Sequence, residues 1–509
     1  MSTSPTLATR DRVIDAVLVV SCGIAQAAAL AVCAFATRDA FAALHTGGGL
    51  AIHTMLALAA AGIVAAICLL LSRRRAESLG QSYAIALRHA LYKQIARLPK
   101  SRHDERRVGA LSLRFVGDLS AARLWFGRGL PDVLSASVVL PAAVAILFAL
   151  DPTLATAGLI PLGAALVVMV LAAWHLERRH RKLRHRRASI AIAMIERIAI
   201  APDLDLMGRT SRELRALDGQ GASLRDDAVA RRGRTAGLQA ILQIGVALSG
   251  LTMLWLASRN GIAPATVAAS LSVLALIAMP MQDLGSAWDK YCAWRVAREK
   301  AQRLLNEPVM RRRSRSKAGP VSVTLTGMYR GKPVKVDANR GEVTKLTGAS
   351  SHTLARLIAG LDASNSVDVR FDGQAQRPRI AHIGDDHLGL QGSLRRSATL
   401  MSRKRPTDKR IAQTLTAFGL ETLLSAPQGL DQRMSENGKG LTAAQSLRLE
   451  LARVVLGKCD VIVIASSRWS AEPDQNSLIE TLRGMTPATI IIAQTAVSST
   501  IALDNEKAL

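Results

Sequence analysis

Six long apolar runs constrain this chain more than any other feature. Each is about long enough to cross a hydrocarbon core of about 30 Å as a helix. Because lipid offers the backbone no hydrogen-bond partners, such runs are expected to be helical there. The sequence therefore predicts an integral, multi-pass membrane protein in contact with the lipid bilayer. The runs are centred near residues 13–36, 51–72, 132–150, 153–175, 236–257 and 264–282.

The first run could also be read as a cleavable signal peptide, but five further runs make a retained span the simpler interpretation. The segments 73–130 and 175–235 are long and rich in arginine. Because Lys and Arg concentrate in cytoplasmic loops, we expect both segments and both termini in the cytoplasm, with the chain in a bacterial-type inner membrane. Apolar residues at helical spacing predict that the membrane helices continue beyond the bilayer.

The net charge of +27 raises the question of a nucleic-acid partner. The basic residues lie beside the apolar runs, as in Arg73–Arg75, so membrane topology explains the charge better. We expect no nucleic-acid partner. The five cysteines have no metal-ligand spacing, and we expect no metal site.

A basic, polar stretch at 311–320 separates the expected membrane domain, 1–310, from a second domain at 321–509. In the second domain, short β-branched runs alternate with helical stretches, which indicates an α/β fold. The fold predicted for the chain is thus an all-α six-helix transmembrane domain with long cytoplasmic extensions, followed by an α/β domain. Strands are expected at Val321–Leu325, Glu342–Leu346, Arg379–Ile383, Val461–Ile464 and Thr489–Ile492.

Several segments of the second domain follow one another in an order that resembles the ABC transporter family. Together with the six spans, they resemble an exporter-type half-transporter, in which the membrane domain and a P-loop NTPase-like nucleotide-binding domain share one polypeptide. The resemblance covers essentially the whole chain. The segments are Gly341–Leu361, Ile380–Leu388, Glu436–Arg453, Val461–Asp474 and Ile490–Thr495.

The first segment resembles a Walker A region without its chemistry. A P-loop needs glycines that let backbone N–H groups wrap the phosphates, a lysine for the terminal phosphates and a hydroxyl for magnesium. This loop is about three residues short against the family pattern and has no lysine between strand and helix. The residues that remain at this degenerate cofactor-binding region are Gly348, Ser350, Ser351, His352 and Thr353.

Four other positions have lost the residues that the family uses. Asp385 stands where the family places a glutamine. Ala465 and Ser466 follow the Walker B-like strand where the family has a magnesium-binding aspartate and a water-activating glutamate. Gln494 stands at the position of the switch histidine. The resemblance therefore implies no catalytic residue in this chain and no ATPase activity from the chain alone.

The signature-like segment is the clearest remnant. Its hydroxyl and its glutamine are retained, whereas two alanines replace glycines and keep N–H donors at a helix N-terminus, where an anion is favoured. Ser470–Asp474 resembles the D-loop that meets the partner subunit in the family. The segment consists of Leu441, Thr442, Ala443, Ala444 and Gln445.

The resemblance implies a heterodimer with an ATPase-competent half-transporter, for ATP-driven export. ATP and magnesium are then expected only at a composite site, between the partner's Walker motifs and Leu441–Gln445. The alternative is a catalytically silent scaffold or regulatory subunit of another membrane complex. Gly109–Leu119 and Leu204–Arg209 are the expected coupling segments.

Overall fold

The computed structural model describes two compact units. Unit 1 comprises Met1–Ala96 and Arg106–Glu307, and unit 2 comprises Arg97–Glu105 and Pro308–Leu509. The short segment Arg97–Glu105 therefore groups with unit 2, which the sequence did not indicate. The described backbone covers all residues except 1–4, 7, 48, 105–116, 311–318, 365, 376, 387–388, 436–439 and 495–509.

The described part of unit 1 consists mainly of long helices, and six of them are apolar and long enough to cross a membrane. The first strongly apolar stretches belong to α1 (Arg10–His45) and α2 (Ile52–Ile95). The third span runs from Gly117 to Leu150 and includes a π-helical turn, η1 (Trp125–Gly129), before α5 (Leu130–Leu150). The remaining helices are α6 (Pro152–Ala199), α7 (Ala201–Leu206), α8 (Thr210–Asn260) and α9 (Pro264–Leu305).

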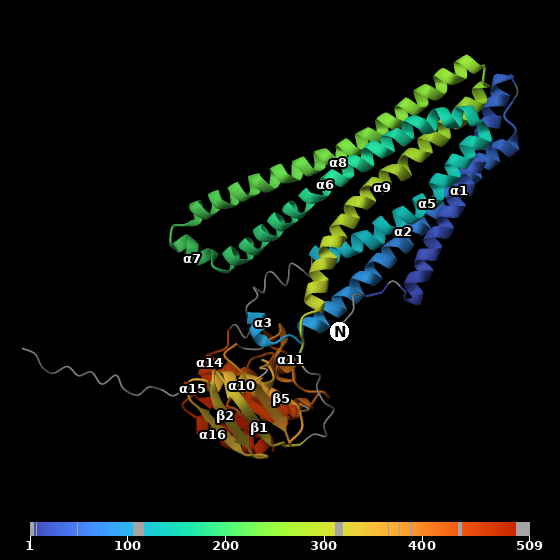
Figure 1. Ribbon diagram of the computed structural model, residues 1–509. Helices are drawn as coiled ribbons and strands as arrows, with labels where there is room; N and C mark the ends of the chain where they lie inside the picture. Colours follow the sequence, from blue (N-terminus) through green and yellow to red (C-terminus); the bar gives the residue numbers. More distant parts are fainter. Residues whose placement is uncertain are drawn as a thin grey trace, which may run out of the picture. The chain divides into compact units, whose positions relative to one another are not determined.

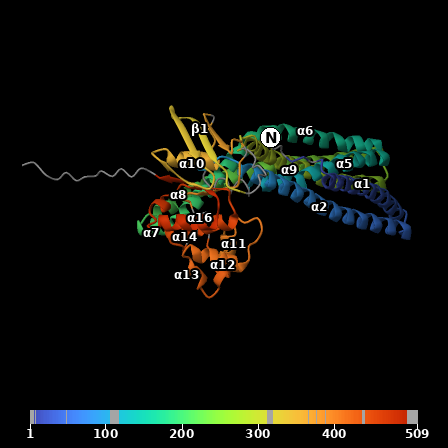
Figure 2. The same cartoon turned by 90° about the horizontal axis from the view of Figure 1, so that it is seen from below.

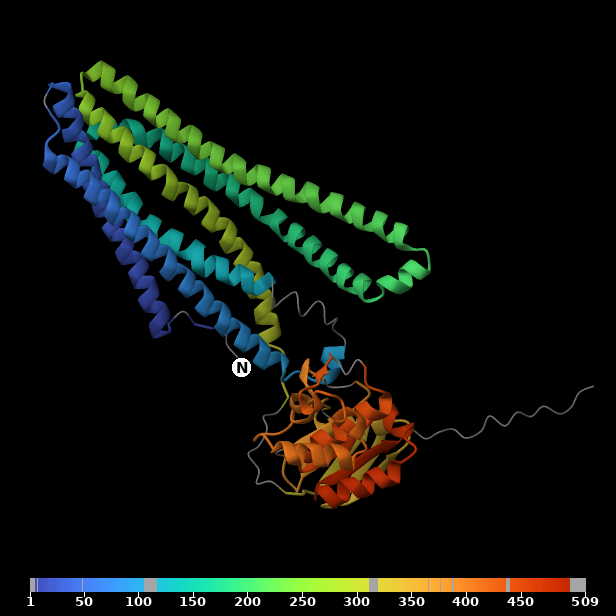
Figure 3. The ribbon, with the colours of Figure 1, turned by 180° about the vertical axis from the view of Figure 1, so that it is seen from behind.

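The six spans and their helical extensions agree with the prediction. α2 and α9 run more than 20 residues past their apolar stretches, and α6 and α8 form a long hairpin with α7 at its tip (Figure 1). α1 packs against α2, α5 and α9, whereas α6 packs mainly along α8 (Figure 3). α9 continues through Pro280 without ending.

An aromatic cluster joins α2, η1 and α9 in unit 1. The ring centroids of Tyr83 and Phe126 lie 3.8 Å apart, and Trp294 packs edge-on against both at 5.5 Å. Beside this cluster, Gly80 lies directly on the backbone of η1, so that a Cβ there would be 2.7 Å from the Cα of Gly127. Small residues are what allow two membrane helices to approach so closely.

Ion pairs reinforce the same region. Asp132, only 5% exposed at its side chain, accepts from Arg73 of α2 at 2.8 Å and from Lys290 of α9 at 2.9 Å. Arg73 also lies 3.5 Å from Asp283. These charges stand where the apolar runs meet polar sequence, and each buried carboxylate oxygen of Asp132 has a cationic partner, as a buried charge requires.

The described residues of unit 2 form three sheets. A three-stranded antiparallel sheet has the order β2-β1-β4, a four-stranded parallel sheet has the order β3-β9-β8-β5, and a two-stranded sheet pairs β6 with β7. The bounds are β1 Val323–Tyr329, β2 Lys332–Ala338, β3 Val343–Thr347, β4 Val367–Phe371, β5 Ile380–Ile383, β6 Gly392–Ser393, β7 Arg433–Met434, β8 Val461–Ile464 and β9 Thr489–Gln494.

The helices of unit 2 lie around these sheets. Figure 2 shows α11, α12 and α13 on the side of the unit away from β1, with α14 and α16 between. The bounds are α3 Lys100–Asp104, α10 Ser351–Ala359, α11 Leu394–Ala398, α12 Asp408–Ala417, α13 Glu421–Leu424, α14 Ala443–Gly457, α15 Ser467–Ser470 and α16 Gln475–Met485, with a 3-10 turn, η2, at Gly429–Asp431.

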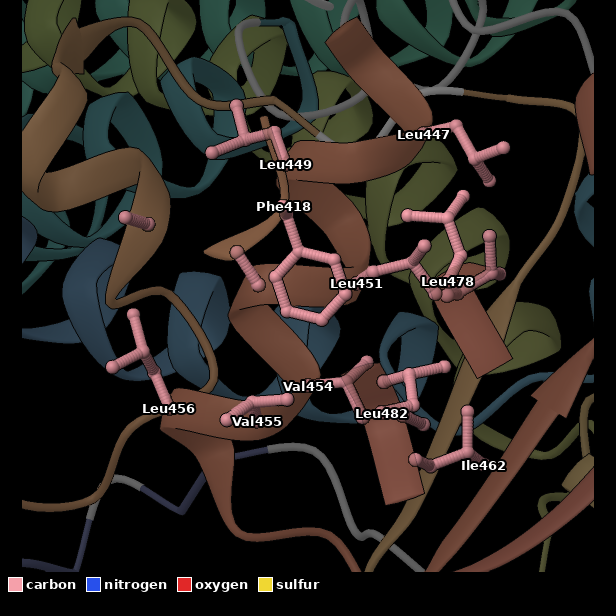
Figure 4. Close-up of a cluster of buried hydrophobic side chains, with 14 of the residues drawn as sticks. Phe418, Leu447, Leu449, Leu451, Val454, Val455, Leu456, Ile462, Leu478 and Leu482 are labelled. Carbon is pink, nitrogen blue, oxygen red and sulfur yellow. The ribbon is translucent and has the colours of Figure 1, made fainter. Parts of the chain in front are cut away.

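The parallel sheet is buried on both faces. Along β8, Ile462 and Ile464 point into a core with α14, whereas Val461 and Val463 point into a second core with α10 and β1. This explains why β8 and β9 are continuous apolar runs rather than alternating ones. Figure 4 shows the first core, in which Phe418 is surrounded by leucines and valines of α14 and by Leu482 of α16.

The close approach at Gly80 leads to a stability prediction. Gly80→Ala should lower the stability of unit 1 by about 1–3 kcal/mol, because the added methyl would overlap backbone atoms of η1 that have little freedom to move. Gly62→Ala is the matched control, because Gly62 lies in the apolar part of the same helix and has open space where the Cβ would be added. Thermal unfolding of the full chain in detergent, followed by size-exclusion chromatography, measures both; equal melting of the two variants would contradict the prediction.

Candidate functional site at the edge of the parallel sheet

The parallel sheet brings most of the predicted site residues to one edge. The strands β3, β5, β8 and β9 are parallel, so their carboxyl ends meet there, as do the loops that follow them. Gly348 follows β3, Asp385 follows β5, Ala465 follows β8, and Gln494 ends β9. These four segments lie apart in the sequence, and only the topology of the sheet makes them neighbours.

The Walker A-like loop is bonded to the end of β9 through Ser351. Gly348 has a φ of +113°, the left-handed region that favours glycine, and α10 begins three residues later at Ser351. Ser351 is 2% exposed, and its hydroxyl donates to the carbonyl oxygen of Gln494 at 3.0 Å. Ser350 precedes α10 without capping it through its side chain, and His352 and Thr353 occupy its first turn.

Asp385 is held by the loop that follows β8. One of its carboxylate oxygens accepts from the backbone N–H of Ser467 at 2.6 Å, from the Ser467 hydroxyl at 2.7 Å and from the Ser466 hydroxyl at 3.3 Å. Burial acts to raise the pKa of Asp385, but these hydrogen bonds and the charge of His352 lower it overall. Asp385 is therefore an ionised structural acceptor.

The two positions after β8 are fully inside the unit. Ala465 is 5% exposed and donates its N–H to the carbonyl oxygen of Ile383 at 2.8 Å, while Ser466 is 0% exposed and caps α15. Neither side chain carries a charge, and the nearby carboxylate of Asp385 is already bonded to Ser466 and Ser467. Among the described residues, the loop between β3 and α10 has no lysine for the phosphates, and Ala465 and Ser466 after β8 provide no carboxylate for the metal, so these residues do not fit a magnesium–ATP complex.

The signature-like residues form a separate group at the start of α14. Thr442 and Gln445 make a capping box: the Gln445 N–H donates to the Thr442 hydroxyl at 3.1 Å, and the Thr442 N–H donates to the Gln445 side-chain oxygen at 3.0 Å. The two residues that the family resemblance singled out thus have a structural role in this chain. Thr442, Ala443 and Ala444 are exposed, and Leu441 is partly buried against the core around Phe418.

Two coupling segments were expected. Of Gly109–Leu119, residues 109–116 lie outside the described part of the chain, and Gly117–Leu119 begin the third span. Leu204–Arg209 lies at the tip of the α6–α8 hairpin, where Leu206 is 87% exposed and Met207 is 68% exposed. Their coupling role stays a prediction.

Sequence reasoning missed the charged residues that surround the edge. Arg468 of α15 contacts Glu450 of α14, and Arg448 of α14 contacts Glu472 at 2.6 Å, with Glu472 only 2% exposed at its side chain. A signal was present, because Glu450 stands between Leu449 and Leu451, two leucines that are fully buried in the core. A charge in such a setting indicates a buried partner, although the sequence does not say which.

His382, near the end of β5, leads to a pH prediction. Burial, and then the positive charges of Lys100 and Arg356, lower the pKa of His382 from 6.5 to about 4. Between these values the unfolded chain binds a proton that the folded chain does not, so stability should fall as the pH drops from 6.5 towards 4. His382→Leu should flatten this fall, as measured by melting temperature at a series of pH values; an unchanged slope would contradict the assignment.

The comparisons with known proteins agree with this architecture. The family model of the ABC transporter transmembrane region matches residues 17–280, which is more than half of the chain. A solved structure titled as a bacterial Atm1-family ABC exporter with ATP bound is similar with a TM-score of 0.78 and 18% identity, covering 96% of this chain and 92% of that chain. At that identity the likeness shows the fold.

Curated relatives match a smaller part of the chain. An "ABC transporter 1" of Ajellomyces capsulatus is 24% identical over 198 residues, covering 34% of this chain. An ATP-dependent lipid A-core flippase of Thiobacillus denitrificans is 27% identical over 176 residues, covering 31% of this chain. The matched segments span only 15% and 30% of these proteins' own lengths. The chain belongs to the family of the ABC transporter transmembrane region, and its fold is that of an exporter-type half-transporter.

Proposed function

We propose that this chain is the catalytically silent half of an ABC exporter and pairs with a second half that supplies the ATP-hydrolysing groups. The observation that carries the proposal is the sheet edge, where Ala465 and Ser466 stand in place of the family's two carboxylates inside an intact fold. Unit 2 is then a degenerate, P-loop NTPase-like domain that contributes structure without chemistry.

In such a pair, the carboxyl edge of this chain's parallel sheet, with its Walker A-like loop and the residues after β8, takes no part in ATP hydrolysis. The hydrolysing site would lie between the partner's Walker motifs and Leu441–Gln445 of this chain, so that ATP and magnesium are bound mainly by the partner. Thr442, Ala443 and Ala444 are exposed at the N-terminus of a 15-residue helix, and that end of a helix favours an anion. The capping box keeps this turn in a defined conformation before any partner arrives.

The proposal places unit 2 and both termini in the cytoplasm, with the spans in a bacterial-type inner membrane. This orientation is inferred from two groups of arginines. One group follows the apolar part of α2, at Arg73–Arg75, and the other lies in the α6–α8 hairpin.

One observation favours a second candidate, a scaffold or regulatory subunit of another membrane complex. Because Thr442 and Gln445 are used to cap α14, their retention does not require a role in a partner's ATP site. A chain that kept the exporter fold only to bind another complex would keep them for stability alone.

Identification of the stoichiometric partner distinguishes the two candidates. The full chain, purified from its native membranes in mild detergent, should carry an ABC half-transporter with intact Walker motifs. Recovery of the chain alone, or with a membrane complex of another family, would contradict the exporter pair and support the scaffold.

The contribution of α14 to the partner's site is tested by a bulky residue at an exposed position. Ala444→Phe leaves the capping pair Thr442 and Gln445 in place, whereas Thr442→Ala would also remove a cap worth about 0.5–2 kcal/mol. In the purified pair, Ala444→Phe should lower ATP turnover at least tenfold without changing the melting temperature. Lys409→Phe, at an exposed position of α12, is the control. Unchanged turnover in Ala444→Phe would show that this chain does not complete the site.

A further inference from the structure

We propose that Arg468 ties the carboxyl edge of the parallel sheet to α14, and that this internal tie holds unit 2 in one conformation without any nucleotide. The inference concerns this chain's own residues, and it stands whether or not the chain pairs with a second half-transporter.

The guanidinium of Arg468 reaches three separate segments. Its Nη1 donates to the hydroxyl of Ser446 at 2.8 Å, and its Nη2 donates to a carboxylate oxygen of Glu450 at 3.0 Å, both on α14. Nη2 also donates to the carbonyl oxygen of Gly384, at the end of β5. Its Nε lies 3.4 Å from the hydroxyl of Ser466, in the loop after β8.

Asp385 makes a further connection between the loop after β5 and the loop after β8. It follows Gly384 at the end of β5 and accepts from Ser466 and Ser467, so the β5 loop and the β8 loop are joined twice. One join is made by the anion of Asp385, the other by the cation of Arg468. α14 is attached to both loops through the same arginine.

Burial makes this arrangement more consequential than a surface ion pair. The side chains of Arg468 and Glu450 are 12% and 4% exposed. Removing one member of a buried pair leaves an uncompensated charge and strongly destabilises the fold, whereas replacing both with apolar residues is often tolerated. Arginine suits this position because its planar group offers five donors in a fixed geometry and remains charged.

The arrangement also needs no ligand to be complete. The positive charge of Arg468 is balanced by Glu450, and the negative charge of Asp385 is bonded to the neighbouring serines. The edge is therefore closed by protein groups where the family resemblance would place phosphate and magnesium. Since Ser446 lies only four residues after Thr442, the tie also fixes the start of α14, and hence the position in which Leu441–Gln445 is presented.

Hydrogen exchange of the full chain in detergent tests the tie. In Arg468→Ala, the backbone N–H groups of Ser467 and of the first two turns of α14 should exchange about 10- to 100-fold faster, and the melting temperature should fall by about 5–10 °C. Arg403→Ala, which removes an exposed arginine of the same unit, is the matched control and should change neither.

A double variant keeps the test decisive where the single variant folds poorly. Arg468→Met combined with Glu450→Leu should recover at least half of the fall in melting temperature, because neither member of the pair is then left charged and buried without the other. The buried Arg453, which also interacts with Glu450, keeps its hydrogen bonds to Ser397. Equal exchange in Arg468→Ala and Arg403→Ala would overturn the proposal. Slower exchange of the Ser467 N–H in the unaltered chain on addition of millimolar magnesium–ATP would also overturn it. The proposal holds that the edge is ordered by its own side chains, so the ligand should not change this exchange rate.

Discussion

Lipid offers no hydrogen-bond partner to an exposed peptide group, and the architecture of unit 1 depends on that constraint. Six apolar runs must each satisfy their own backbone, and helices do so. The helices then continue beyond their apolar stretches, as α2, α6, α8 and α9 do. Charged side chains lie between the helices where the apolar stretches end. There, Asp132 forms ion pairs with Arg73 and Lys290. The aromatic cluster of Tyr83, Phe126 and Trp294 joins the same helices at this level.

On the proposed function, unit 2 keeps its apolar cores without the ATP chemistry of the family. Its two cores are built from the alternate faces of β8 and β9, together with α10 on one side and α14 on the other. None of the positions that depart from the family pattern is needed for that apolar packing, apart from Ala465, whose methyl group joins the core. Four of the departures, Asp385, Ala465, Ser466 and Gln494, lie at the polar edge, where Asp385, Ser466 and Arg468 hydrogen-bond with one another. The positions where the family resemblance expects ligand-binding groups thus take part in hydrogen bonds within the protein.

The sequence was informative wherever apolar pattern decides the structure. It predicted the six spans and five of the strands, because long apolar runs and buried β-branched runs have few alternatives. It did not predict β2 (Lys332–Ala338) or β4 (Val367–Phe371), in which partly buried and exposed residues alternate and charged side chains interrupt the apolar signal. Strands of an antiparallel sheet with one exposed face are difficult to recognise for that reason.

The sequence was enough to predict which positions make up the candidate site, but it was not enough to predict the contacts between their side chains. The family pattern identified Asp385, Ala465, Ser466 and Gln494 as departures, and the topology of the parallel sheet places them together. The pairing of Arg468 with Glu450, 18 residues away, depends on how α14 crosses the sheet edge, which no local pattern specifies. The family resemblance indicates that Thr442 and Gln445 are remnants of a nucleotide-binding signature, although their spacing is also that of a capping box.

Equilibrium binding of magnesium–ATP to the purified chain alone tests the central claim most directly, since it asks whether unit 2 has kept a nucleotide site of its own. The account predicts no saturable binding up to millimolar concentrations, because the described residues directly after β3 and β8 include neither the lysine nor the carboxylates that the family uses, and Asp385, Ser466 and Arg468 hydrogen-bond with one another there. Saturable binding of one nucleotide per chain, at concentrations well below millimolar, would contradict it.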